Sequence, residues 1–277
     1  MENPWNFFRY KYVISLKHRS DRREHVKKEL TRFGIYDNFK IFDAVYGKEC
    51  LYMRNYLSTN KIIPAGSVLS DGELGCLFSH YLVWLECLLK VRNERDEFWI
   101  LILEDDAKFH PKFTNSKFSE IISNIPKNAL YLKFGFLVGS YEKATVDISN
   151  PYWKKLCNVT FSTIAYAVKS RYLLNLLNTV YFYPIDHQLH SVNAYALKDI
   201  YDDDNTDNEF FDRECINMEF NGSFSYFKEK YRGIIGAREN GIDSDVNISH
   251  VLFAQKFRNG SIQIPSEKKH IFSKFIH

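Results

Sequence analysis

The sequence has little of what marks several large classes of protein. It contains 12 glycines and 7 prolines among 277 residues, which excludes collagen-like and low-complexity chains. Its five cysteines form no Cys-x-x-Cys pair and are odd in number, so we expect reduced thiols rather than a disulfide framework. Its 37 basic and 34 acidic residues leave a net charge of only +3. The basic residues form no dense stripe, and nucleic acid is therefore not an expected partner.

Long apolar runs are also missing. The longest stretches, at 98–103 and 76–91, fall short of the roughly 20 residues that span a bilayer. The N-terminus shows no basic segment followed by an apolar run, so no secretory signal is expected. These features predict a cytoplasmic protein without a transmembrane segment. The final residues KKHIFSKFIH leave open a peripheral membrane contact beside an ordinary docked C-terminus.

What the sequence does have is the composition of a folded domain. Hydrophobic residues make up 45% and aromatic residues 16% of the chain, enough to form a sizeable core. Strand-like runs alternate with helix-like ones, which indicates an α/β fold with parallel strands. We expect strands at 12–16, 40–47, 98–103, 129–135 and 161–168. We expect helices that begin near Ser20 and Ser70 and over 170–178, and a loop with a short helix in 52–68.

Two helix ends carry clear signals. Ser70 and Glu73 have the spacing of a capping box at the start of a helix. In that helix Leu77, Trp84 and their neighbours at 81 and 88 form one apolar face. Gly34 is placed to end the helix that begins near Ser20.

Three consecutive acids, Glu104, Asp105 and Asp106, follow the apolar strand predicted at 98–103. Ligands of open α/β sheets bind beyond the carboxyl ends of the strands. In an extended chain Glu104 and Asp106 would point to one side, where their oxygens suit Mg²⁺ or Mn²⁺ bound to a sugar-nucleotide diphosphate. Neutralisation by arginine, or solvation at the strand end, is the alternative. A second acidic run at 202–204 follows no buried strand, and we interpret it as a solvated loop.

Six motifs, in order along residues 10–190, together resemble glycosyltransferase family 25, whose members are lipopolysaccharide and collagen-type galactosyl- and glucosyltransferases. The motifs are VISLKHRSDRRE at 13–24, FDAVYG at 42–47, LSDGELGCLFSHYLVW at 69–84, LILEDDA at 101–107, STIAYAV at 162–168 and PID at 184–186. The sequence departs from the family pattern at Ser15, where asparagine is usual, and at Ser162 and Ala165.

The resemblance implies a GT-A type fold, with a Rossmann-like nucleotide-binding sheet and helices on both faces. It implies one domain over 1–277, whose nucleotide-sugar half covers about 10–135 and whose acceptor half covers about 136–277. The implied reaction transfers a hexose, with galactose favoured over glucose, from a UDP-sugar with Mn²⁺ or Mg²⁺ and with inversion. The implied acceptor is a glycan, a lipid-linked glycan or a hydroxylysine-type group.

The resemblance also suggests which residues bind the donor and its metal ion. Glu104 and Asp106 would ligate the ion, Asp105 would act through water, and His250 would be a remote ligand, although a lone histidine is more often a surface or core residue. Arginines suit a diphosphate because guanidinium binds it bidentately. The candidates are Arg19, Arg22 and Arg23. The alternative for Arg22 and Arg23 is that they are only surface charges in the first turn of an exposed helix.

Five further residues match family motifs. Glu73, Ser79 and His80 belong to a Gly-Glu-x-Gly-Cys-x-x-Ser-His pattern, and the resemblance implies that they bind the UDP-sugar donor. Glu73 is equally explained by the capping box, and His80 by an apolar helix face. Asp186 is the candidate base that takes the proton of the acceptor hydroxyl, or alternatively the N-cap of a helix. Tyr166 would line the sugar pocket or belong to the core.

Two other classes of function remain. A non-catalytic protein that binds a nucleotide sugar would retain the same fold and motifs. A Mg²⁺-dependent phosphotransferase or nuclease is disfavoured, because the sequence has no glycine-rich phosphate loop with a lysine and no basic groove.

Overall fold

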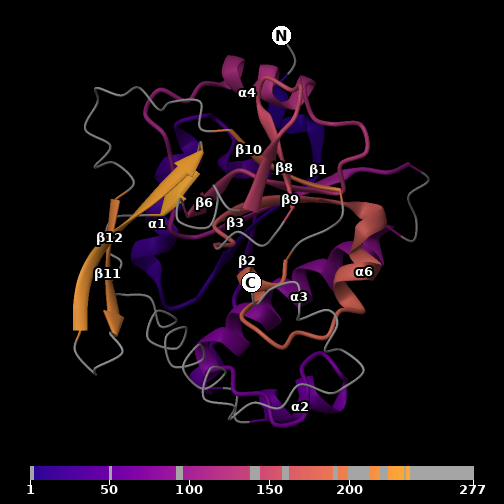
Figure 1. Ribbon diagram of the computed structural model, residues 1–277, viewed down its shortest axis with the longest axis vertical. Coiled ribbons are helices and arrows are strands. Elements are labelled where there is room, and N and C mark those ends of the chain that lie inside the picture. The colour runs from indigo at the N-terminus through magenta and orange to yellow at the C-terminus, as the bar shows by residue number, and fades with distance from the viewer. Residues whose placement is uncertain are drawn as a thin grey trace.

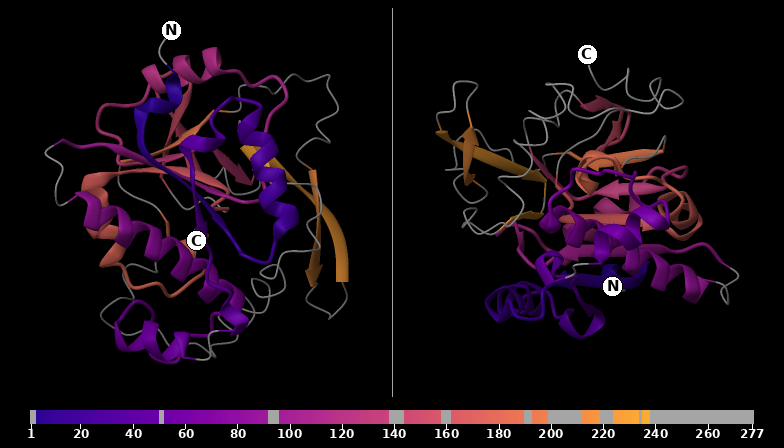
Figure 2. Two further views of the ribbon diagram at one scale, coloured as in Figure 1. Left: turned by 180° about the vertical axis from the view of Figure 1, so that it is seen from behind. Right: turned by 90° about the horizontal axis from the view of Figure 1, so that it is seen from below.

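A computed structural model of the chain describes residues 3–49, 52–91, 96–137, 144–157, 162–189, 193–198, 212–218, 224–233 and 235–237. Its centre is an eight-stranded sheet with the strand order β2-β1-β3-β9-β5-β10-β8-β7. Helices cover both faces of this sheet, as Figures 1 and 2 show. The α/β fold class expected from the sequence is therefore confirmed.

The strands of the main sheet are β1 (Phe8–Ser15), β2 (Lys40–Asp43), β3 (Trp99–Glu104), β5 (Tyr131–Lys133), β7 (Thr145–Asp147), β8 (Trp153–Leu156), β9 (Ala165–Lys169) and β10 (Ala194–Leu197). A smaller sheet joins β6 (Gly135–Leu137), β12 (Phe224–Gly233) and β11 (Asp212–Met218), and another pairs β4 (Ala107–Phe109) with β13 (Ile235–Ala237). The helices are α1 (Ser20–Thr31), α2 (Met53–Thr59), α3 (Asp71–Val91), α4 (Asn115–Ser123) and α6 (Leu173–Leu177). Short 3-10 turns are η1 (Pro4–Phe7), η2 (Tyr36–Asn38), η3 (Gly47–Glu49), η4 (Ser170–Tyr172) and η5 (Ile185–His187).

The main sheet is mixed rather than parallel as the sequence predicted. β1 runs parallel to β2 and β3, and β5 parallel to β10. β9, however, lies antiparallel between β3 and β5, and β8 is antiparallel to both β10 and β7. The prediction was wrong because apolar periodicity identifies a strand that is buried on both faces without indicating its direction.

Successive residues of the central strands enter two separate cores. On β3, Leu101 and Leu103 pack with α1 and α4, whereas Ile100 and Ile102 pack with α3 and α6. Side chains of a strand alternate between the faces of a sheet, so both sets must be apolar, which explains the continuous run WILIL. We call these cores the α1-side and the α3-side core. α3 and α6 lie next to each other over the second one (Figures 1 and 2).

The predicted helix ends are confirmed. Ser70 and Glu73 form the capping box, since the Ser70 N–H donates to the Glu73 carboxylate at 2.7 Å and the Glu73 N–H donates to the Ser70 hydroxyl at 3.2 Å. Gly34 follows α1 with a φ of 69°, which suits glycine. Within the described ranges, no helix is long and apolar enough to cross a bilayer.

The strand predicted at 40–47 ends early, at Asp43, because the chain then turns against the start of α3. A Cβ on Gly47 would lie 1.7 Å from the Asp71 carbonyl oxygen, and one on Gly75 would lie 2.7 Å from the Val45 carbonyl oxygen. Only glycine permits such close approach of two backbones. These two glycines therefore bring the segment after β2 against the helix that carries the Ser-His motif.

A half-buried carboxylate connects α3 to the first two strands. Glu86 accepts hydrogen bonds from the Tyr12 hydroxyl at 2.9 Å and from the Lys40 ammonium at 2.7 Å, and it pairs with Lys90 at 2.8 Å. Burial by itself would raise the pKa of Glu86, but these donors outweigh it and lower the pKa to about 2. The ionised form is therefore bound more strongly in the folded chain than in the unfolded one.

Because the folded pKa is depressed, this stabilisation is present above the unfolded pKa of about 4.3 and is lost as the pH falls toward about 2. Because solvent screens this partly exposed group, we expect Glu86→Gln to lower the free energy of unfolding at pH 7 by about 1 kcal/mol. The difference from the native chain should shrink as the pH falls through this window. Urea unfolding across pH 2 to 7 measures it. The same change at exposed Glu24 of α1 is the control, and a deficit independent of pH would contradict the assignment.

Candidate active site

The acidic motif lies where β3 ends, and its three carboxylates separate. The extended conformation stops at Glu104, and Asp105 and Asp106 form a turn that leads into β4. The alternation that would place Glu104 and Asp106 on one side therefore does not continue. Glu104 faces α3, whereas Asp105 and Asp106 both approach Arg22 of α1.

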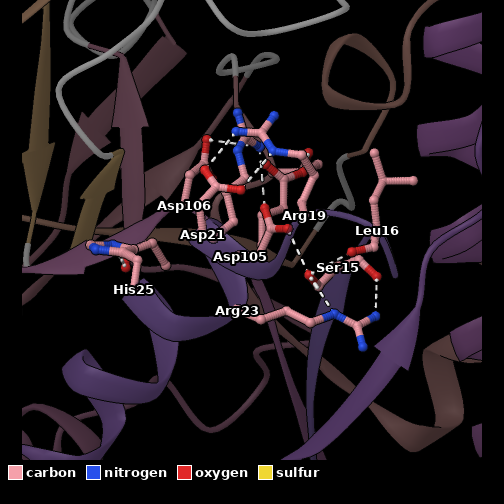
Figure 3. A network of polar contacts seen from close by, with 12 residues as sticks. Ser15, Leu16, Arg19, Asp21, Arg23, His25, Asp105 and Asp106 are labelled. Atoms are coloured by element: carbon pink, nitrogen blue, oxygen red, sulfur yellow. Dashed lines mark hydrogen bonds and ion pairs between the residues drawn. The ribbon is translucent and has the colours of Figure 1, made fainter.

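Asp105 is buried and lies between two donors. The Ser15 hydroxyl, at the end of β1, donates to its carboxylate at 2.8 Å (Figure 3). The Arg22 guanidinium donates to the same carboxylate at 3.2 Å. Burial raises the pKa of Asp105, and although Arg22 and Ser15 oppose that shift, the net direction is upward. Arg22 also lies 3.9 Å from Asp106. Arginine thus neutralises part of this acidic cluster, which is the alternative that the sequence left open.

The other two arginines of the first motif also have acidic partners. Arg19 forms a two-pronged contact with Asp21, at 3.0 and 2.9 Å. Arg23 donates to the backbone carbonyl of Ser15 at 3.0 Å and to Asp43 of β2 at 2.5 Å (Figure 3). The predicted contacts of these side chains with a diphosphate stay predictions.

On the opposite face of the sheet, Glu104 begins a chain of hydrogen bonds that enters the α3-side core. His80 Nε2 lies 3.4 Å from Glu104 Oε1, which also accepts from the Thr163 hydroxyl at 2.5 Å. His80 Nδ1 lies 2.7 Å from the Tyr166 hydroxyl, and Trp84 Nε1 donates to that hydroxyl at 3.1 Å. A carboxylate can only accept here, so a neutral His80 carries its proton on Nε2 and Tyr166 donates to Nδ1. The network is fully directed and holds one oxygen of Glu104 in place.

Three side chains of this region have the chemistry of metal ligands. The ligand atoms of Cys76, His80 and Glu104 lie within 4.8 Å of one another, and in the part of the chain that the structure describes no other trio of this kind occurs. A thiolate, an imidazole and a carboxylate are the donor set of zinc rather than of magnesium or manganese. Burial, followed by the charges of Glu104, Asp186 and Glu73, raises the pKa of the Cys76 thiol well above its ordinary value. Without an ion the thiol therefore keeps its proton.

Two residues of the Ser-His motif contact backbone. Glu73 closes the capping box described above, which confirms the structural explanation given for it. The Ser79 hydroxyl is buried, donates to the Gly75 carbonyl at 2.6 Å and accepts from the Val45 N–H at 2.8 Å. Ser79 therefore joins α3 to the segment after β2. Binding of the UDP-sugar by Glu73 or Ser79 stays a prediction.

Asp186 lies inside the turn η5 and is not the N-cap of a helix, so that alternative was wrong. The residue that precedes the turn is Pro184, and η5 ends after three residues. The Asp186 carboxylate instead accepts the Ser162 N–H at 3.1 Å. Ser162 has a φ of 79°, and its hydroxyl accepts from the Ile164 N–H at 3.2 Å. The first two residues of the motif STIAYAV thus contact both carboxylates, Ser162 that of Asp186 and Thr163 that of Glu104.

Tyr166 is fully buried, and its hydroxyl belongs to the hydrogen-bond network, so the structure bears out its place in the core. The predicted site residues do not include four other polar residues around this edge of the sheet: Ser15, Cys76, Thr163 and Lys133. Lys133 had a visible signal, because it ends the apolar run ALYLK, where a charged side chain is unusual. His250 and the acidic run at 202–204 lie outside the described residues.

Ser162 should carry backbone strain that glycine would relieve. A left-handed conformation costs an L-residue about 1–2 kcal/mol. Ser162→Gly and Ser162→Ala both lose the hydroxyl, but only the alanine variant keeps the strain. We expect the alanine variant to have a free energy of unfolding about 1 kcal/mol below that of the glycine variant. Urea unfolding measures the difference, and an alanine variant as stable as the glycine variant would show that Ser162 is unstrained.

Parts of the chain are similar in sequence to several known proteins. Procollagen galactosyltransferase 1-B of Xenopus laevis is 40% identical over 105 residues, which are 35% of this chain and 16% of that protein. Procollagen lysyl hydroxylase and glycosyltransferase of Acanthamoeba polyphaga mimivirus is 30% identical over 204 residues, 69% of this chain and 22% of that protein. Lipooligosaccharide biosynthesis protein lic2B of Haemophilus influenzae is 37% identical over 99 residues, 35% of this chain and 33% of that protein.

The chain thus spans at most about a third of the length of each of these three relatives. The family model described as "Glycosyltransferase family 25 (LPS biosynthesis protein)" matches residues 8–199. That range contains both the network around Glu104 and the loop that holds Asp186. The chain therefore belongs to glycosyltransferase family 25.

Proposed function

We propose that this chain transfers a hexose, with galactose as the first candidate, from a UDP-sugar to a glycan, a lipid-linked glycan or a hydroxylysine-type acceptor. Two of the relatives described above carry galactosyltransferase or lysyl hydroxylase and glycosyltransferase in their names, and a third is a lipooligosaccharide biosynthesis protein. The observation that carries the proposal is the meeting of Asp186 and Glu104 at one edge of the sheet. The adjacent residues Ser162 and Thr163 donate hydrogen bonds to them, Ser162 N–H to Asp186 at 3.1 Å and the Thr163 hydroxyl to Glu104 at 2.5 Å.

A divalent cation, Mn²⁺ or Mg²⁺, belongs to this proposal. Its predicted ligands are Glu104 and Asp106, with Asp105 acting through water and His250 as a remote ligand. Because Glu104 faces α3 and Asp106 approaches Arg22 of α1, an ion that both hold would have to lie between them at the end of β3. The residues fit such an ion in one respect, since Glu104 uses a single carboxylate oxygen, Oε1, in its hydrogen bonds with His80 and Thr163, which leaves a hard oxygen for the ion. When bound, the ion supplies positive charge that stabilises the departing diphosphate. Arg22 and the ion would then both lie against the carboxylates of Asp105 and Asp106.

Asp186 would act as the base. In an inverting transfer the acceptor oxygen attacks the anomeric carbon, the bond from that carbon to the diphosphate oxygen breaks, and the hydroxyl proton passes to the base. The N–H of Ser162 donates to the Asp186 carboxylate, which favours its ionised form. Arg19, Arg22 and Arg23 lie at the end of β1, beside the acidic motif, from where a guanidinium can reach a phosphate.

A non-catalytic protein that binds a nucleotide sugar is the second candidate. The pairing of Arg22 with Asp105 favours it, because an arginine that neutralises the cluster reduces the need for a metal ion. Such a protein would be stabilised by UDP without turning over a donor.

The test measures UDP release from UDP-galactose and UDP-glucose, with Mn²⁺, with Mg²⁺ and with a chelator, and with hydroxylysine-containing peptide or lipooligosaccharide as acceptor. We expect release to require the cation. Asp186→Asn should lower kcat by about 10²–10⁴-fold, the usual contribution of a general base. Asp106→Ala should lower activity and weaken the dependence on the cation. Asp147→Asn on β7, an exposed carboxylate at the far edge of the sheet, is the control.

UDP-induced thermal stabilisation without release would favour the second candidate. A folded Asp186→Asn variant with the native kcat would remove Asp186 from the reaction. Release that proceeds equally well with chelator would remove the metal ion.

A further inference from the structure

Cys76, His80 and Glu104 converge at the carboxyl end of β3, on its α3 side. One ligand atom of each, a sulfur, an imidazole nitrogen and a carboxylate oxygen, lies within 4.8 Å of the other two. Cys76 and His80 are four residues apart on α3, a spacing that places two side chains on one face of a helix. The proposed transfer reaction gives no role to the cysteine, because Mn²⁺ and Mg²⁺ prefer oxygen ligands to sulfur.

The spacing of these atoms suits a single tetrahedral ion. Zinc binds histidine nitrogen and carboxylate oxygen at about 2.0–2.2 Å, so two such ligands of one ion lie about 3.3 Å apart. His80 Nε2 and Glu104 Oε1 lie 3.4 Å apart, whereas an ordinary N–H···O hydrogen bond measures about 2.7–3.2 Å. A zinc-bound sulfur lies about 3.6 Å from the other ligand atoms. The sulfur of Cys76 therefore needs to move by at most about 1.2 Å from its present limit of 4.8 Å.

Hydrogen bonds already orient two of the three ligands. The Tyr166 hydroxyl lies 2.7 Å from His80 Nδ1, so Nε2 is the ring nitrogen that faces Glu104. Thr163 donates to Glu104 Oε1 at 2.5 Å, and that oxygen has a second lone pair for an ion. Partners of this kind hold the ligands of metal sites in general. With an ion on Nε2, the His80 proton lies on Nδ1 and is donated to the Tyr166 oxygen, which has two lone pairs and also accepts from Trp84.

The trio is reached from solvent on one side. His80 is fully buried, whereas Cys76 is half-buried and 27% of the Glu104 side chain is exposed. An ion can therefore enter from the edge of the sheet. Water can take the fourth position of a tetrahedral zinc that has three protein ligands. The Cys76 thiol gives its proton to water as the bond from sulfur to the ion forms.

We propose that Cys76, His80 and Glu104 bind Zn²⁺, at a site distinct from that of the Mn²⁺ or Mg²⁺ of the transfer reaction. A thiolate, an imidazole and a carboxylate together select zinc. Zinc on Oε1 neutralises the Glu104 carboxylate and repels a second dication beside it, so zinc inhibits the transfer. Only the inhibition rests on the proposed function. The binding of zinc does not.

Cobalt reports the site directly, because tetrahedral Co²⁺ takes the place of zinc and absorbs light where zinc does not. The full chain, freed of metal with a chelator, is titrated with Co²⁺ and then with excess Zn²⁺. We expect a thiolate-to-cobalt charge-transfer band in the near ultraviolet and strong visible bands, and the loss of both on addition of Zn²⁺. A native chain that shows no charge-transfer band would overturn the proposal.

Variants of the cysteines locate the ion. Cys76→Ser should remove the charge-transfer band and weaken Co²⁺ binding more than about 100-fold, since loss of a mere hydrogen-bond partner of a ligand costs about 10–100-fold. Cys157→Ser, at an exposed cysteine, is the matched control and should keep the native spectrum. A band that persists in Cys76→Ser, or that disappears in Cys157→Ser, would overturn the proposal. Circular dichroism checks folding, and Cys76→Ala takes the place of the serine variant if that one does not fold.

Glu104→Gln separates the carboxylate from the other two ligands. This variant should keep the charge-transfer band, because Cys76 is still present, and should bind Co²⁺ more than about 10-fold more weakly. An unchanged affinity would remove Glu104 from the site, and with it the reason for inhibition.

The inhibition is measured as UDP release from UDP-galactose with Mn²⁺ and rising Zn²⁺. We expect Zn²⁺ to inhibit the native chain and additional Mn²⁺ to restore the release. Cys76→Ser should need about 10-fold more Zn²⁺ or above for half inhibition, and Cys157→Ser should match the native chain. Equal sensitivity of Cys76→Ser and the native chain would overturn the inhibitory role. A chain that binds Co²⁺ through Cys76 but releases no UDP under any condition would refute the proposed function and support the zinc site.

Discussion

Buried charge at the carboxyl end of the sheet determines much of the arrangement around it. A carboxylate removed from water costs several kcal/mol unless donors replace its hydration. Buried Asp105 meets this requirement with Ser15 and Arg22, and Glu104, which is only partly buried, has His80 and Thr163 as donors. Each of these donors comes from another element of the chain. The acidic motif therefore connects β1, α1, α3 and the loop before β9 to the end of β3.

The turn after β3 divides the motif between the two faces of the sheet. Glu104 is the last extended residue and shares the α3 side with His80 and Lys133. Asp105 and Asp106 follow in the turn and share Arg22 on the α1 side. One face thus has the directed hydrogen-bond network, and the other has the arginines that suit a phosphate. A UDP-sugar bound across this edge would contact both the network and the arginines.

The long helix α3 combines support of the fold with organisation of the site. Its capping box and Gly75 bring its first turns against the segment after β2. Farther along, His80 enters the network, and Glu86 connects the helix to β1 and β2. Because these contacts lie on one helix, displacement of α3 would disturb the ion pairs of Glu86 and the hydrogen-bond network of His80 together. The Ser-His motif of α3 therefore contributes to the stability of the fold as well as to the candidate site.

Much of the fold could be predicted from the sequence because its signals are local. The capping box at Ser70, the glycine that ends α1 and the continuous apolar run of β3 each depend on a few neighbouring residues. Strand direction could not be predicted, since a strand buried on both faces has the same composition whichever way it runs. The antiparallel position of β9 between β3 and β5 is therefore information that only the assembled sheet contains.

The same distinction applies to the site. The sequence by itself determined that acids follow a buried strand, that arginines follow another, and that Asp186 lies in a turn after a proline. Only the tertiary structure decided that Arg22 meets Asp105, that Thr163 reaches Glu104, and that Lys133 is buried on the same face. The reason is physical. Whether a charged group is compensated depends on side chains from distant parts of the chain, and local sequence patterns do not show which distant residues become neighbours in the fold.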